Sequence, residues 1–245
     1  MAKKFYKEQR NHSTFFQNAA ERVVSWNAIA MNESPSNYEK FAEKFTHEKF
    51  VHQISLVEEE LKEYRDAFQA QDQVEMLDAA ADIFVVSGFL TYMFFGPAIL
   101  NEFMKYGVAD HLASDPYETL CRSREVLDSS DQTAFLMAAI FRSSRDSLVK
   151  TVHDGKGAIL EVLRSNDSKF PTEQQLRDSH QLLTEDISEV LEAELAWIKE
   201  NRTEYSDFSV VYNEEFEVYT FLDGNGKYMK PSTFSPANLK PFMVE

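Results

Sequence analysis

Hydrophobic residues recur at three- and four-residue steps along most of this chain, the spacing that gathers side chains on one face of an α-helix. The pattern predicts an all-α protein, a helical bundle with a four-helix core. We expect helices over 14–31, from 38 to the Gln-rich turn after 68, and over 74–95, 116–127, 133–152, 158–164 and 172–201. Near the C-terminus the pattern changes to two β-rich runs, SVVY and FEVYTFL, which predict a small β-hairpin.

The segment from Leu56 to Leu90 predicts a helical hairpin lined with carboxylates. Its first arm presents an apolar face that we expect to lie in the core, formed by Ile54, Val57, Leu61, Tyr64 and Phe68. The second arm, from Val74 onwards, is apolar in nearly every direction, which is typical of a helix surrounded by protein.

Acidic residues border the apolar faces of both arms. Glu60 and Glu63 adjoin the buried face of the first arm, and Glu75, Asp78 and Asp82 form a row on the second. A buried carboxylate is costly unless it is paired, and the second arm carries no Lys or Arg up to Leu90. The row therefore needs a partner from outside the hairpin.

A hard divalent cation would satisfy this row, because carboxylate oxygens from two facing helices can hold it and leave positions open for phosphate oxygens. Mg²⁺ suits an all-oxygen site best, with Mn²⁺ as the alternative. The same acids could instead pair with lysines from elsewhere in the fold, or they could simply face solvent. The pattern alone does not decide between a bound cation, lysine partners and exposure to solvent.

Two motifs in the hairpin resemble those of a known family. The sequence EELKE at 59–63, followed by EMLD at 75–78, is similar to the EExxE and ExxD pair of the all-α nucleoside triphosphate pyrophosphohydrolases, the MazG-like superfamily. The run DAAADIFVV at 78–86 resembles the variant found in phage-encoded members. The resemblance implies hydrolysis of a ribo- or deoxyribonucleoside triphosphate to the monophosphate and pyrophosphate.

The resemblance also implies roles for particular residues. The metal ligands would be Glu60, Glu63, Glu75 and Asp78. Glu59 and Asp82 would be catalytic accessory acids, one of which accepts the proton of the attacking water. Whether Glu59 or Glu60 is the direct ligand stays open. Family members assemble through these helices, so a homodimer or homotetramer is expected.

Two later segments resemble the phage-type members as well. SNDSKFP at 165–171 is similar to an SNxSKF segment in which Asn and Lys lie near the nucleotide, which implies substrate binding by Asn166 and Lys169. A capping turn explains the same residues without a ligand. The tail GKYMKPSTFSP resembles the family's C-terminal segment, so Lys227 and Lys230 are further substrate-binding candidates, although docking of the tail explains them equally well.

The remaining patterns give weaker expectations. Residues 1–13 are polar and basic and predict a loose arm. Arg142, Arg145 and Lys150 are candidate phosphate neighbours, although a solvated face is the favoured interpretation. The predicted helix over 172–201 turns one apolar stripe inward, formed by Leu183, Ile187, Val190, Leu191, Leu195 and Ile198.

The acids of the predicted 172–201 helix serve as a control for the hairpin. Glu185, Glu189 and Glu192 lie opposite the apolar stripe, so we expect a solvated face rather than a second metal site. Glu194 falls inside the stripe, and the pattern does not account for it. In domain terms, we expect a core over 1–171 and, in the same compact unit, an inserted long helix, the hairpin and a docking tail over 172–245.

Composition limits the functional classes. The net charge of −16 argues against a nucleic-acid polymer as partner, because the phosphates would be repelled. The single cysteine, Cys121, excludes an internal disulfide framework and a Cys-based zinc cluster. We expect no signal peptide and no membrane-spanning segment, and therefore a cytoplasmic protein. Two alternatives to the pyrophosphohydrolase remain: an inactive helical binding module, and a related hydrolase of an alarmone or nucleotide sugar.

Overall fold

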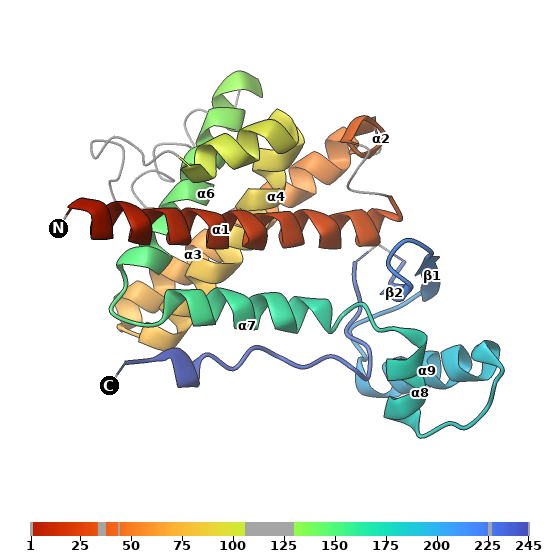
Figure 1. Cartoon of the computed structure of the whole chain (residues 1–245). Coiled ribbons are helices and arrows are strands. Elements are labelled where there is room, and N and C mark those ends of the chain that lie inside the picture. The colour runs from red at the N-terminus through yellow and green to blue at the C-terminus, as the bar shows by residue number, and fades with distance from the viewer. Residues whose placement is uncertain (1, 34–37, 44, 106–129, 225–226, 245) are drawn as a thin grey trace. The chain divides into compact units, whose positions relative to one another are not determined.

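The computed structural model describes residues 2–33, 38–43, 45–105, 130–224 and 227–244 (Figure 1). The described chain is mostly helical and has a two-stranded antiparallel hairpin near its C-terminus, as the hydrophobic pattern predicts. It forms two compact units. The first contains residues 1–24, 38–162 and 238–245, and the second contains residues 25–37 and 163–237.

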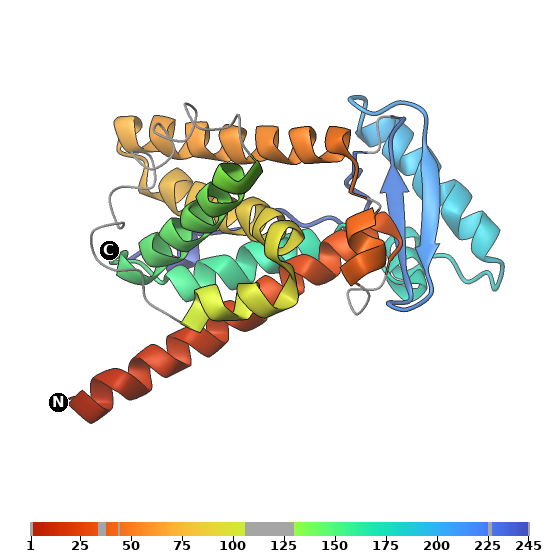
Figure 2. The ribbon, with the colours of Figure 1, turned by 90° about the horizontal axis from the view of Figure 1, so that it is seen from above.

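The first unit is built around helix α4 (Gln73–Lys105), which packs against α3 (His47–Ala70) and α6 (Ser130–Lys150) (Figures 1 and 2). Buried apolar side chains from the three helices form its core: Val57, Leu61, Ile83, Leu90, Met137 and Ile140. This packing surrounds α4 with parts of its own chain. Packing within one chain thus explains why α4 is apolar on all sides. The apolar surface of α4 therefore gives no separate support to the expected homo-oligomer.

Helix α1 (Ala2–Met31) is longer than predicted. The expected loose arm over 1–13 is helical from Ala2, because no Gly or Pro interrupts the sequence before Met31. Within the first unit, α1 packs on α4, where the rings of Phe16 and Phe84 lie 5.6 Å apart in an edge-on contact. The predicted helix over 14–31 is confirmed.

The helix expected from residue 38 through to the hairpin turn is two helices. The short helix α2 (Tyr38–Glu43) ends, and α3 begins afresh after Thr46, whose hydroxyl accepts a hydrogen bond from the backbone N–H of Lys49 at 3.4 Å. Further along, α4 is kinked at Gly96, where φ is 73°, in agreement with the break predicted at Gly96-Pro97. The loop predicted over 107–115 and the helix predicted over 116–127 lie outside the described residues.

Part of α4 is long and apolar enough to cross a membrane, namely the 24 residues from Gln73 to Gly96. By length and composition, this helix goes against the expectation of no spanning segment. However, 67% of its most apolar window is buried inside the protein. Such burial is what the core helix of a soluble protein shows, and one helix of this kind is weak evidence for a span.

The start of α7 (Gly155–Asp167) lies tightly against α6. A Cβ added at Gly155 would lie 2.0 Å from the carbonyl oxygen of Leu148, a backbone atom that cannot rotate away. Gly155→Ala should therefore lower the free energy of unfolding by about 1–3 kcal/mol, the usual cost of forcing extra volume into a packed site. Chemical denaturation measures this loss. Leu160→Ala, which shortens an exposed side chain on the same helix, is the control. Equal denaturation midpoints for the two variants would contradict the tight packing at Gly155.

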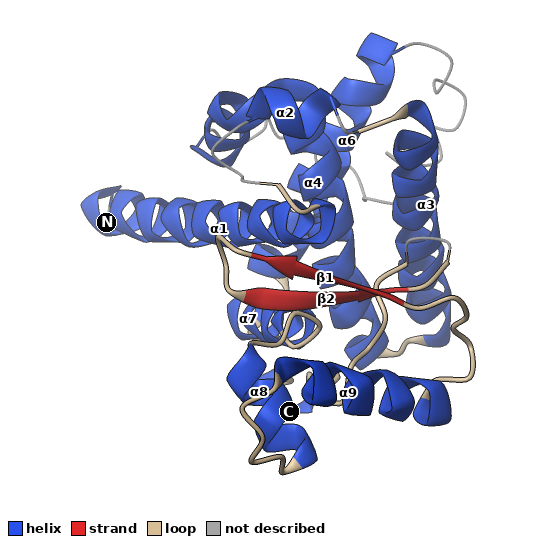
Figure 3. Cartoon of the chain, turned by 90° about the vertical axis from the view of Figure 1, so that its right-hand side faces the viewer, coloured by secondary structure: helices blue, strands red, loops and turns tan. Residues whose placement is uncertain are grey.

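The second unit packs α8 (Glu173–His180) and α9 (Ile187–Asn201) with the hairpin of β1 (Ser209–Asn213) and β2 (Val218–Leu222) (Figure 3). The strands pair antiparallel from Ser209 opposite Leu222 to Asn213 opposite Val218. The connecting turn is closed by the Asn213 side-chain oxygen, which accepts hydrogen bonds from the backbone N–H groups of Glu215 and Phe216, both at 3.1 Å. The predicted hairpin is confirmed.

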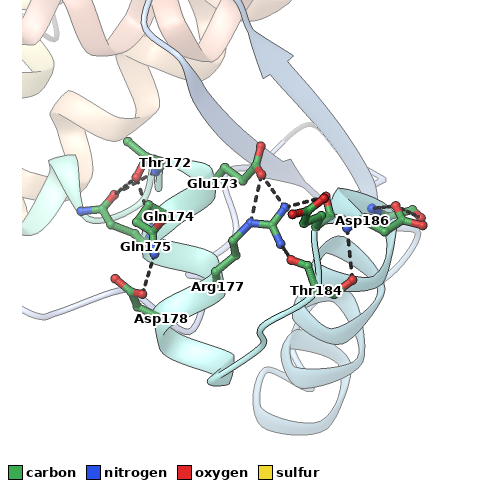
Figure 4. Close-up of polar contacts among 10 residues, drawn as sticks. Thr172, Glu173, Gln174, Gln175, Arg177, Asp178, Thr184 and Asp186 are labelled. Atoms are coloured by element: carbon green, nitrogen blue, oxygen red, sulfur yellow. Dashed lines mark hydrogen bonds and ion pairs between the residues drawn. The ribbon is translucent and has the colours of Figure 1, made fainter.

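The single helix predicted over 172–201 is wrong, because the chain turns between α8 and α9. Gln181 adopts a left-handed conformation with φ 54°, and Asp186 caps α9 by accepting a hydrogen bond from the backbone N–H of Ser188 at 2.9 Å. Arg177 holds the connection by donating to the Glu173 carboxylate and to the Thr184 carbonyl oxygen (Figure 4). Leu183, expected to point inward, is fully exposed in this connection.

The C-terminal segment 238–244 lies along α7 in the first unit (Figure 1). Its backbone is held by two hydrogen bonds of 2.9 Å: the Asn238 N–H donates to the Glu161 carboxylate, and the Phe242 carbonyl oxygen accepts from the Asp154 N–H. A single turn of 3₁₀ helix, Lys240–Phe242, lies between these two contacts. This is the docking expected for the end of the tail.

Candidate functional site

The predicted helical hairpin is formed by α3 and α4, joined by a short turn. Gln71 takes the left-handed conformation that ends α3, with φ 58°. The next residue, Asp72, caps α4, because its side-chain oxygen accepts hydrogen bonds from the backbone N–H groups of Val74 and Glu75, both at 3.1 Å. This turn places the first turns of α4 against the last turns of α3.

The predicted core face of α3 is largely correct. Val57 and Leu61 are buried, and Ile54 and Tyr64 are half-buried beside them. The prediction for Phe68 is wrong, because 61% of this residue is exposed in the last turn of the helix, where Ala67 takes the buried position. The solvent side is as expected, since Lys62 and Asp66 form an exposed ion pair with an N–O distance of 2.6 Å.

Six acids named from the sequence come from this hairpin, and we call them the acid cluster: Glu59, Glu60, Glu63, Glu75, Asp78 and Asp82. They differ in depth. Glu60, Asp78 and Asp82 are half-buried, while the other three acids are exposed. The two helices thus place three carboxylates at the edge of the core and three around it.

Electrostatic interactions connect the whole cluster. The pKa of Glu60 is raised to about 8, first by burial and then by four neighbouring carboxylates: Asp82, Glu63, Glu59 and Asp78. The pKa of Asp78 is also raised, by burial first and then by the negative charges of Glu75 and Glu63. Burial and like charges both disfavour the ionised form of a carboxyl group. Each of the other four acids of the cluster therefore lies close enough to Glu60, to Asp78 or to both to raise a pKa.

Glu60 has a further distinguishing feature. Its Oε2 atom is buried, and no hydrogen-bond donor reaches it from any residue that the structure describes. A buried polar atom without a partner costs free energy, of the order of 1–3 kcal/mol in proteins. Among the described residues, this carboxylate oxygen is therefore buried without a hydrogen-bond donor.

The cluster is not a ready-made metal site. Across the described residues, no three His, Cys, Asp or Glu side chains converge in an arrangement that could hold an ion as they stand. Carboxylate side chains that repel one another adopt separated rotamers, and a cation would have to draw them together. The chemistry of the donors, all of them carboxylate oxygens, suits Mg²⁺ or Mn²⁺.

Asn166 and Lys169 lie together in the second unit, at the end of α7. The Lys169 ammonium donates a hydrogen bond of 2.6 Å to the Asn166 side-chain oxygen, and the Lys169 N–H donates to the Asn166 carbonyl oxygen at 3.0 Å. These contacts form the turn that accounts for both residues without a ligand. The acid cluster belongs to the first unit, so the two groups of candidates are parts of different units.

The two lysines of the tail also belong to the second unit. Lys227 and Lys230 are both exposed, and the Lys230 ammonium lies 5.0 Å from the centre of the Phe234 ring. A cation over an aromatic face gains a modest electrostatic attraction. Lys230 thus makes a contact within the tail.

Arg142 on α6 differs from the solvated position favoured for it. Only 9% of this residue is exposed, and its pKa is lowered to about 10 by burial first and then by the charge of Arg145. Arg145 is half-buried and pairs with Asp146 at an N–O distance of 2.5 Å. Burial of Arg142 was not evident in the sequence, because it depends on how α6 is rotated against α4.

Comparisons with protein-family models, with curated proteins and with solved structures gave no match for this chain. Its function is therefore inferred from the geometry and electrostatics of the acid cluster.

Proposed function

We propose that the chain is a metal-dependent hydrolase that converts a nucleoside triphosphate, ribo- or deoxyribo-, to the monophosphate and pyrophosphate. The observation that carries the proposal is Glu60 Oε2, a buried carboxylate oxygen without a hydrogen-bond donor in the described chain, surrounded by other carboxylates. A divalent cation would remove both the missing contact and the mutual repulsion. The motif resemblance of 59–63 and 75–78 agrees with this assignment.

The proposal gives the acids of the cluster separate roles. Mg²⁺, or Mn²⁺ in its place, would be held by Glu60, Glu63, Glu75 and Asp78. When bound, such an ion neutralises phosphate charge and orients the reacting groups. Glu59 is exposed and Asp82 is half-buried, and one of these two carboxylates would accept the proton of the attacking water.

Glu60 is favoured over Glu59 as the direct ligand. Glu60 carries the buried, unpartnered oxygen and the pKa raised to about 8, whereas Glu59 is exposed. A carboxylate that is strained without a cation gains most from binding one. Glu59 is then one of the two carboxylates, with Asp82, that would accept the proton of the attacking water.

Asn166 and Lys169 are proposed as substrate contacts on the motif resemblance of 165–171 alone. Asn166 offers an amide to a base edge or a sugar hydroxyl, and Lys169 offers a positive charge to a phosphate oxygen. Lys227 and Lys230, exposed on the tail of the same unit, would add further positive charge. Loss of substrate affinity without loss of metal binding is the signature expected when these residues are changed.

A nucleotide panel tests the reaction. The protein with Mg²⁺ should release pyrophosphate and the monophosphate from at least one ribo- or deoxyribonucleoside triphosphate, and excess chelator should abolish the release. Direct separation of the products measures both. Release of inorganic phosphate and the diphosphate instead would contradict cleavage between the α and β phosphates. If the protein hydrolyses only an alarmone or a nucleotide sugar, its substrate is a different phosphoanhydride, cleaved at the same site.

A catalytically inactive binding module is the second candidate. It is favoured by the absence of a ready-made metal arrangement among the described side chains. In that case the acid cluster would be an electrostatic surface, and Mg²⁺ would not stabilise the protein. The homo-oligomeric state and the cytoplasmic location stay predictions.

A further inference from the structure

Glu194 on α9 is a fully buried carboxylate that the proposed reaction does not use. Its side chain is 0% exposed. It accepts three short hydrogen bonds: from the Ser232 N–H at 2.7 Å, from the Ser232 hydroxyl at 2.5 Å and from His180 Nε2 at 2.7 Å. Burying a carboxylate is costly unless donors surround it, and hydrogen bonds to an ionised acceptor are the strong ones. These three donors thus explain the acid inside the apolar stripe.

The three bonds fix a segment that follows the β-hairpin. Ser232 begins the segment 232–236, whereas His180 and Glu194 lie on helices α8 and α9. Ser179, beside His180, also places its hydroxyl 2.9 Å from the Ser232 hydroxyl. Glu194 therefore connects Ser232 of the tail with both α8 and α9.

The same segment holds the turn that contains Asn166 and Lys169. The Thr233 hydroxyl donates to the Ser168 carbonyl oxygen at 3.1 Å, and the Ser235 N–H donates to the Ser168 hydroxyl at 3.0 Å. One residue of the turn therefore receives two hydrogen bonds from the segment that Ser232 anchors. Loss of the anchor at Ser232 would free the groups that restrain Ser168.

We propose that Glu194 is a positioning residue for the turn 165–169, acting through Ser232 and the segment 232–236. The proposal rests on the proposed function for the role of Asn166 and Lys169. Glu194 itself makes no contact with substrate or metal in this scheme. Its effect is to hold the turn in one conformation before the nucleotide arrives, which lowers the ordering cost of binding.

Glu194→Leu tests the proposal, with Glu192→Leu as the matched control. Both remove a carboxylate from α9, but Glu192 is exposed. Glu194→Leu should raise KM about tenfold, the change that ~1.4 kcal/mol of lost binding produces, and leave kcat close to the wild-type value. Glu194→Gln should recover part of the loss, because its amide oxygen can still accept from the Ser232 N–H.

Amide hydrogen exchange measures the loosening of the turn 165–169 directly and does not depend on an activity assay. In Glu194→Leu, the N–H groups of Lys169, Phe170 and Ser235 should exchange faster, and in Glu192→Leu they should not. Thr233→Val gives a second variant in case Glu194→Leu fails to fold, since it removes one bond to Ser168 and leaves Glu194 and its donors intact. It should speed exchange at Lys169 and Phe170 by a smaller factor.

The outcomes separate the two proposals. Unchanged exchange at Lys169 and Phe170 in the folded variants would overturn the positioning role, as would a fall in kcat with unchanged KM. A wild-type protein without pyrophosphate release would refute the proposed function instead. The exchange measurement would then decide the positioning claim alone.

Discussion

Asp78→Asn should lose magnesium-dependent pyrophosphate release by about a hundredfold or more, because a metal ligand supports several kcal/mol of transition-state stabilisation and each 1.36 kcal/mol is tenfold in rate. Asp78 is half-buried on α4, and its carboxyl interacts with Glu75 and Glu63. Asparagine keeps the size of the side chain and removes only the charge. Glu63→Gln, on the facing helix α3, should have an effect of the same kind. Steady-state pyrophosphate assays at saturating Mg²⁺ measure both.

Asp66→Asn is the matched control for these variants. Asp66 also lies on α3, but it is exposed, pairs with Lys62 and does not contribute to the raised pKa of Glu60. Its turnover should match the wild type. Full activity in Asp78→Asn or in Glu63→Gln would remove the metal-ligand assignment, and an equal loss in Asp66→Asn would point to a general effect of net charge.

Without metal, the stability of the protein should fall as pH rises between about 4.5 and 8. The Glu60 carboxyl, whose ordinary pKa is 4.5, has a pKa of about 8 in the folded protein. In this window the folded chain keeps a proton that the unfolded chain has released, so the free energy of unfolding decreases with pH. The limit for one such group is about 1.4 kcal/mol per pH unit. The raised pKa of Asp78 acts in the same direction.

Glu60→Gln isolates this contribution. Without the buried carboxylate, the metal-free variant should be more stable than the wild type near pH 8, and its stability should depend less on pH across the window. Urea unfolding in excess chelator at several pH values between about 5 and 8 measures the difference. Parallel curves for the two proteins would show that Glu60 is not strained in the folded state. The gain in stability should be accompanied by loss of turnover, as expected when a functional site is neutralised.

The α3–α4 hairpin could be predicted because its signals agree with one another. Helical periodicity on α3, a polar turn at 69–73 and the apolar surface of α4 all point to two facing helices. The same periodicity placed the acids on the facing surfaces. It could not rank them by depth, because the half-buried position of Glu60 and the exposure of Glu63 depend on the rotation of the packed helices.

Errors arose where a local cap overrides the hydrophobic period. The period continues through Thr46 and through 181–186, but a capping hydroxyl in one case and a left-handed Gln181 with Asp186 in the other end the helices. Leu183, in the connection between α8 and α9, is exposed for this reason, whereas Phe68 is exposed because it lies in the last turn of α3, just before the left-handed Gln71.

Glu194 could not be explained from the sequence because its donors are distant along the chain. Ser232 lies 38 residues away, beyond the hairpin, and His180 lies on the other side of the break between α8 and α9. Periodicity identifies a residue on an apolar face but not a polar partner that arrives from another element. The buried Arg142 on α6 was missed for a related reason, since its burial depends on packing against a neighbouring helix.

The most direct measurement is the melting temperature of the protein as Mg²⁺ is raised to about 10 mM, because an ion that binds only the folded state stabilises it by mass action. The wild type and Asp66→Asn should gain stability along a saturating curve, and Asp78→Asn should gain none. A wild-type melting temperature that Mg²⁺ and Mn²⁺ leave unchanged would contradict the claim that the acid cluster holds a divalent cation.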